Sequence, residues 1–176
     1  MLAKATDAHW CERLCDLSGT PAAHLTSLKD VADFLSKRGA TNQAASIVEF
    51  GLRHNPLHAG LLACKASLGR PWEEKDLRAT MKQLAEVHAV DANGIGVELW
   101  QQSQYRSAAS VFETVIARNT NSATAWVNLG VNREALGDYK SAEMAYLTAL
   151  ALDPVYTFAR ESYQRFVRRL EDGKPK

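Results

Sequence analysis

Two cysteines near the start of the chain have a spacing that could support metal or redox chemistry. Cys11 and Cys15 are four residues apart, which would place both thiols on one face of a helix. A structural zinc site needs four ligands, however, and Cys64 stands alone while His9 and His24 lack ligand spacing. We therefore favour the alternative, in which two small apolar side chains pack against a neighbouring helix.

Two further patterns match site motifs only in part. His54 and His58 are also four residues apart, but Pro56 between them prevents the shared helical face that two zinc ligands need. The Gly-Ile-Gly stretch at 94–96 lacks the preceding strand and the third glycine of a dinucleotide-binding loop. We therefore predict no catalytic residue, no metal site and no cofactor, and a protein that is not an enzyme.

A group of arginines near the C-terminus is the main local excess of charge, and it consists of Arg160, Arg165, Arg168 and Arg169. It could meet an anionic partner, such as an acidic peptide or a nucleic acid, or form a solvated surface near a helix C-terminus. The whole chain carries 21 lysines and arginines against 20 acidic residues, a net charge of +1. This balance favours the solvated surface, and we expect no nucleic-acid partner.

The composition predicts a soluble, cytoplasmic protein. Hydrophobic residues make up 46% of the chain, which is enough for a core. No apolar stretch approaches the ~18 residues that a membrane helix needs, so we expect no membrane insertion. The first residues lack the apolar core of a signal peptide, and an odd number of cysteines suits a reducing compartment.

An internal repeat organises the chain, and its clearest copy spans 123–156. Spacings of three and four residues place Trp126, Leu129 and Gly130 on one face of a first helix. Gly137 is expected at the turn that follows. The residues expected to pack inside the second helix, and the proline that ends it, are Ala142, Tyr146, Ala149 and Pro154.

The same pattern recurs 34 residues earlier, at 89–122. Gly96, Ala108 and Phe112 stand where Gly130, Ala142 and Tyr146 stand in the later copy. A further copy at 25–58 has Ala44 in its second helix, Gly39 at its turn and Pro56 at its end. The 59–88 interval is too short for a full copy, so we interpret it as a degenerate unit with helices at 59–68 and 71–88.

This signature of Trp-x2-Leu-Gly, Ala-x3-aromatic and proline over 34 residues resembles the tetratricopeptide repeat (TPR) family. The resemblance implies an all-α, superhelical solenoid of antiparallel helix pairs with capping helices at both ends. We expect an N-terminal cap at 1–20, an array at 21–156, and a C-terminal capping helix with a short tail at 157–176. Arg133 departs from the family, which usually has tyrosine there.

The resemblance also implies a concave groove lined by the first helix of each repeat. Carried over by position, the groove residues are Lys29, Asp33, Lys37, Asn93, Val97, Trp100, Gln101, Thr124, Val127, Asn128, Val131 and Glu134. Trp100 has no required packing role, so we expect either a binding hot spot or a contact with the degenerate unit. Because Asp33 stands where a chaperone-tail clamp needs asparagine, we expect no such clamp.

The leading hypothesis is therefore a non-catalytic adaptor or scaffold that holds a peptide segment of a partner protein in this groove. A second hypothesis is a structural module that self-associates into a homo-oligomer. A third is a cytosolic, chaperone-like holder of secretion substrates.

Overall fold

The computed structural model describes residues 21–69 and 72–173, with the backbone alone for 21–27. Every regular element in these ranges is an α-helix, so the predicted all-α fold is confirmed. The chain divides into two compact units, 1–70 and 71–176. The predicted N-terminal cap at 1–20, with Cys11 and Cys15, lies outside the described residues, as do the last three residues of the tail.

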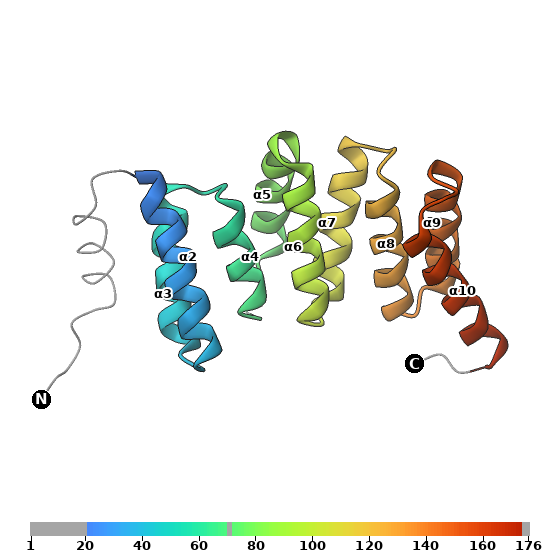
Figure 1. Ribbon diagram of the computed structural model, residues 1–176, viewed down its shortest axis with the longest axis horizontal. Helices are drawn as coiled ribbons and strands as arrows, with labels where there is room; N and C mark the ends of the chain where they lie inside the picture. Colours follow the sequence, from blue (N-terminus) through green and yellow to red (C-terminus); the bar gives the residue numbers. More distant parts are fainter. Residues whose placement is uncertain (1–20, 70–71, 174–176) are drawn as a thin grey trace, which may run out of the picture. The chain divides into compact units, whose positions relative to one another are not determined.

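The first unit contains a helical hairpin with a third helix packed against both of its arms (Figure 1). Its helices are α2 (Pro21–Lys37), α3 (Thr41–His54) and α4 (Ala59–Ser67). Gly39 adopts a φ of 79° at the turn between α2 and α3, a conformation that costs glycine little. The core of this unit joins all three helices through buried side chains that include Leu28, Val48 and Leu61.

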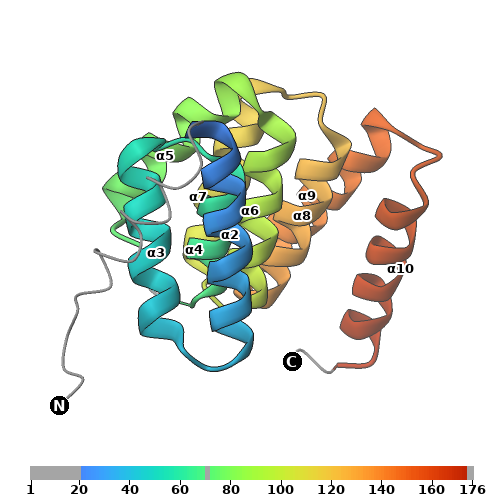
Figure 2. The same ribbon diagram turned by 60° about the vertical axis from the view of Figure 1, so that its left-hand side comes forward.

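The second unit contains two consecutive helical hairpins, with one more helix packed on each side of them (Figure 1). Its helices are α5 (Glu74–Val87), α6 (Ala89–Gln101), α7 (Tyr105–Arg118), α8 (Ala123–Ala135), α9 (Tyr139–Leu152) and α10 (Thr157–Glu171). The helix α5 contacts α6 and α7, whereas α10 contacts α8 and α9. Figure 2 shows α8 and α9 adjacent to each other, with α10 at the end of the row.

Each hairpin of the second unit is held together by a glycine that faces an aromatic ring. A Cβ atom added at Gly96 would lie 2.5 Å from the Phe112 ring, and one added at Gly130 would lie 2.8 Å from the Tyr146 ring. Both rings are buried, with 1% and 0% of their surface exposed. Ala108 and Ala142 are also fully buried. Only a residue without a side chain allows these helices to approach so closely.

The helices begin and end where the glycine and proline residues predict, with one exception. Gly137 has a φ of 78° after α8, and the extended Asp153 ends α9 directly before Pro154. The exception is α5, which begins at Glu74 and not at the predicted Pro71. Glu73 has an extended ψ of 127° and so cannot belong to the helix.

The helix α10 completes the core of the second unit. Its Ala159 and Phe166 are buried together with Val127 of α8 and Tyr146 of α9. The Phe166 and Tyr146 rings lie 5.5 Å apart, within the range of aromatic pairs. The helix α10 therefore covers an apolar face of the α8–α9 hairpin.

Candidate functional site

The helices α6 and α8 are joined by a pair of amide side chains. Asn128 on α8 donates a hydrogen bond from Nδ2 to Oδ1 of Asn93 on α6, at 3.2 Å. Both side chains are half-buried. Val97 follows Asn93 by four residues and Val131 follows Asn128 by three, so each valine shares a helix face with its asparagine. The two faces together present paired amides beside two half-buried apolar side chains.

A pocket of about 610 Å³ adjoins the last turns of these two helices. Its aromatic walls come from four different helices and consist of Trp100, Tyr105, Tyr139 and Phe166. Val131 and Glu134 of α8 and two arginines of α10 complete much of the lining. The size falls in the range of small-ligand and side-chain binding sites.

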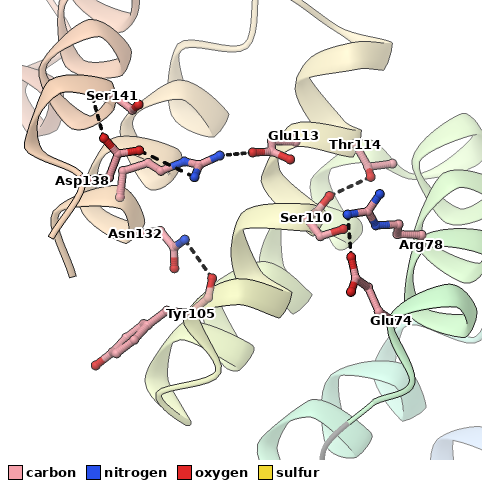
Figure 3. Close-up of polar contacts among 10 residues, drawn as sticks. Glu74, Arg78, Tyr105, Ser110, Glu113, Thr114, Asn132, Asp138 and Ser141 are labelled. Carbon is pink, nitrogen blue, oxygen red and sulfur yellow. Dashed lines mark hydrogen bonds and ion pairs between the residues drawn. The ribbon is translucent and has the colours of Figure 1, made fainter. Parts of the chain in front are cut away.

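The position of Tyr105 at this pocket is fixed by a buried side chain of α8. Asn132 is fully buried and donates from Nδ2 to the backbone carbonyl of Tyr105 at 2.9 Å (Figure 3). Its neighbour Arg133 pairs with Glu113 of α7 and lies 3.8 Å from Asp138. Arg133, which departs from the family pattern, therefore links α7 to the turn before α9. Asn132 could not be predicted from the sequence, because the partner of a buried amide depends on tertiary packing.

A buried carboxylate forms one side of the pocket. Glu134 is only 9% exposed and accepts a hydrogen bond from the Tyr146 hydroxyl at 2.9 Å. Its other oxygen accepts one from Arg169 of α10. Burial raises the pKa of Tyr146, and the Glu134 carboxylate raises it further, while Arg165 and Arg169 act in the opposite direction. Glu134, Tyr146 and Arg169 thus connect α8, α9 and α10 in a single polar network.

The predicted groove residues of the second unit differ in their accessibility. Gln101 and Thr124 are exposed, whereas Trp100 is half-buried and its ring centroid lies 6.4 Å from that of Tyr105. Val127 does not line a groove, because it is fully buried in the core beneath α10. Glu134 lines the pocket, as expected of a groove residue, but both of its carboxylate oxygens already accept hydrogen bonds from Tyr146 and Arg169.

The predicted groove residues of the first unit bond mainly to each other. Lys29 donates to Asp33 at 2.6 Å, and the thiol of the buried Cys64 donates to the same carboxylate at 2.9 Å. Burial raises the pKa of Asp33, but the hydrogen bonds from Cys64 and Lys29 outweigh it, and the net shift is downward. Lys37 is exposed at the end of α2. Thus the first unit presents an internal ion pair where the second presents amides and apolar side chains.

A scan against known families matches residues 93–157 to the tetratricopeptide repeat. Residues 93–157 are tetratricopeptide repeats. This match covers most of α6 through α9, the two hairpins built on Gly96 and Gly130. The predicted resemblance to the TPR family is therefore confirmed. The TPR is a protein-interaction fold, and its members are generally non-catalytic.

No curated protein matches the chain. Among solved structures, the C-terminal TPR-containing domain of a putative FK506-binding protein from Plasmodium falciparum is 17% identical, with a TM-score of 0.49 and 97% of each chain covered. A crystal structure of MamA is 19% identical, with a TM-score of 0.48 and 82% of this chain and 81% of MamA covered. The first TPR domain of Spaghetti (RPAP3), bound to the HSP90 peptide SRMEEVD, is 16% identical, with a TM-score of 0.47 and 84% and 93% covered.

The other predicted packing residues of these TPR hairpins occupy a range of environments. Leu129 is 8% exposed, and Trp126 is half-buried and donates from Nε1 to the carbonyl of Thr120 at 2.8 Å. Pro154 is exposed in the connection to α10. In the first unit, Ala44 is fully buried. Tryptophan at position 126 therefore anchors the loop before α8 as well as packing against the core.

Within the described ranges, no three histidine, cysteine or acidic side chains gather as a metal site would require. None of the described helices combines the length and the apolar character that crossing a bilayer demands.

Proposed function

We propose that the second unit binds an extended segment of a partner protein along α6 and α8, and that the protein acts as a non-catalytic adaptor or scaffold. The observation that carries this proposal is the Asn93–Asn128 amide pair across the two helices, beside Val97 and Val131. A peptide bound in extended form offers one N–H and one C=O per residue, which paired amides can satisfy.

The amide pair has hydrogen-bonding groups left for a ligand. Each asparagine side chain has an acceptor oxygen and two donor hydrogens, and the bond between them uses one donor and one acceptor. The Oδ1 of Asn128 and the Nδ2 of Asn93 make no hydrogen bond to other described residues. A peptide N–H can therefore donate to Asn128 while a peptide C=O accepts from Asn93.

Apolar side chains beside the amides supply the contact area that hydrogen bonds alone do not. Val97 and Val131 are half-buried, and Trp100 lies one further turn along α6 at the pocket wall. The Nε1–H of Trp100 is buried and has no acceptor among the described residues. A partly exposed tryptophan next to a pocket has the character of an interface hot spot.

Selection from a random dodecapeptide library tests this proposal directly. We expect bound peptides to shift the NMR signals of the Asn93 and Asn128 side-chain amides. Trp100→Ala should weaken binding by at least about tenfold, as hot-spot truncations do, while circular dichroism shows that the helix content is retained.

The matched control is Val87→Ala, which truncates an apolar side chain that is 67% exposed at the end of α5. This variant should bind the peptides as the natural chain does. Peptides that bind Trp100→Ala with unaltered affinity would contradict the assignment of the face. If the chain instead self-associates in light scattering, and Trp100→Ala abolishes that association, the occupant is a second copy and the adaptor proposal fails.

A further inference from the structure

The pocket between α8 and α10 holds two guanidinium groups and one carboxylate. Arg169 is paired with Glu134, which also accepts from Tyr146. Arg165 is exposed, lines the same pocket, and donates to the Ser162 hydroxyl at 3.3 Å. Among the described residues it makes no ion pair. One positive charge at the pocket is therefore left without a counter-charge.

The position of Arg165 makes this charge available inside the pocket. Both Arg165 and Arg169 lower the pKa of the buried Tyr146 hydroxyl, against the burial and the Glu134 carboxylate that raise it. Both arginines also line the pocket beside Glu134, the carboxylate that accepts a hydrogen bond from this hydroxyl. Arg160 and Arg168 are exposed on the same helix, so the field around α10 is positive as well.

The rest of the pocket is apolar and aromatic. Trp100, Tyr139 and Phe166 contribute ring surface, and Val131 and Leu170 contribute aliphatic surface. A volume of about 610 Å³ is much larger than a single carboxylate and accommodates a side chain with its neighbour. The surroundings of Arg165 thus suit an anionic group carried on an apolar segment.

We propose that this pocket takes an acidic side chain, aspartate or glutamate, of the partner segment bound along α6 and α8. The inference rests on the proposed function and adds the chemistry of the partner. A carboxylate accepts two parallel hydrogen bonds from one guanidinium group. A single water molecule cannot offer Arg165 this bidentate geometry or the opposite charge. The flanking residue of the segment contacts the aromatic wall.

Peptides from the random dodecapeptide library supply the test. We expect the selected peptides to share an acidic residue. Replacing that residue by its amide should weaken binding to the natural chain by about tenfold, since a charge-assisted bond is lost. Arg165→Gln should weaken the acidic peptide by a similar factor and make it indistinguishable from the amide peptide.

The matched control is Arg168→Gln, which removes the same charge from the same helix at an exposed position outside the pocket lining. This variant should retain most of the preference for the acidic peptide. Arg165 is itself exposed, so the melting temperature of Arg165→Gln should match that of the natural chain. An equal loss in both variants would mean that only the net charge of α10 matters, which overturns the inference.

The outcomes separate this inference from the function on which it rests. Peptides that depend on Trp100 but show no preference for an acidic residue overturn the inference and leave the function intact. If no peptide binds the face of α6 and α8, both fail. A single-stranded oligonucleotide that binds the natural chain but not Arg165→Gln, while acidic peptides do not bind, would assign the pocket to phosphate and overturn the inference.

Discussion

The hairpins α6–α7 and α8–α9 use the same close contact but differ in what surrounds it. In both, a glycine of the first helix faces a buried aromatic ring of the second, Gly96 with Phe112 and Gly130 with Tyr146. The residue 34 positions before Glu134 is Trp100. Thus the hairpin with phenylalanine has an indole at that position, and the hairpin with tyrosine has a carboxylate that accepts from its hydroxyl.

This difference shows how a repeat acquires a polar site without changing its packing. The Tyr146 ring occupies the position in its hairpin that Phe112 occupies in the earlier one. Its hydroxyl donates to Glu134, which also accepts from Arg169 of α10. The turns differ as well. Gly137 occupies the left-handed conformation after α8, whereas Ser103 occupies it after α6 with a φ of 59°. The earlier hairpin therefore contains a strained turn that the later one avoids.

The largest expected effect comes from removing the buried rings. Tyr146→Ala and Phe112→Ala should each reduce the free energy of unfolding by roughly 3–5 kcal/mol, because both leave cavities. Tyr146→Ala should cost more, since Glu134 also loses a donor while it remains buried. Urea unfolding of the two variants measures the difference. A negligible loss at either ring would show that the repeat register is wrong at that hairpin, whereas equal losses would show that the bond to Glu134 adds no stability.

Substitution of the facing glycines should have the next largest effect. Gly96→Ala and Gly130→Ala should each cost roughly 1–3 kcal/mol, because the added methyl group would overlap a ring that cannot move freely. Gly94→Ala is the control on the same helix, with nothing within 4 Å of the added atom. It should stabilise the protein by up to about 1 kcal/mol through helix propensity. Thermal unfolding of the three variants shows which of them are destabilised and which is stabilised.

Tyr146→Phe should separate the polar contact from the packing. At neutral pH it should cost about 1.5 kcal/mol, because one hydrogen bond to a buried carboxylate is lost. The folded-state pKa of Tyr146 is raised above its ordinary value of 10.0, so its stabilising contribution is present below that pH and is lost as the pH rises above it.

The free energy of unfolding of the natural chain should therefore fall, relative to Tyr146→Phe, by up to about 1.4 kcal/mol per pH unit above pH 10. Tyr105→Phe is the control, because within the described part of the chain its hydroxyl donates only to the exposed Ser103, at 3.5 Å. A constant difference between Tyr146→Phe and the natural chain across this range would mean that the Tyr146 hydroxyl is not buried.

The smallest expected effect is at the strained turn. Ser103→Gly should raise the free energy of unfolding by about 0.5–1 kcal/mol, because glycine adopts a positive φ without steric cost. The reverse change at the equivalent position, Gly137→Ser, should lower it by a similar amount. If differential scanning calorimetry finds no change in either variant, the two turns do not differ in strain.

The hairpins could be predicted from the sequence because their determinants are local. Gly137 and Pro154 mark helix ends, and the spacing of Ala142 and Tyr146 gives the inward face of α9. The site could be predicted only in part. Val127 was expected in the groove by its position in the repeat, but α10 covers it, and that contact joins residues far apart in the chain.

The same limit applies to the charges of α10. The sequence favours a solvated surface for Arg160, Arg165, Arg168 and Arg169, because such runs usually end helices. The structure pairs Arg169 with a buried carboxylate 35 positions earlier and places Arg165 at the pocket. Spacing within one helix cannot distinguish these two arginines from Arg168, since their partners lie on other helices.

The docking of α10 has a consequence for how binding and local unfolding are linked. Because Arg165, Phe166 and Arg169 belong to α10, the pocket exists only while this helix is in place. The helix α10 packs on α8 and α9, so any local opening of α10 removes the pocket and competes with the binding-competent state. A ligand in the pocket must then slow hydrogen exchange along α10, at residues that it never touches.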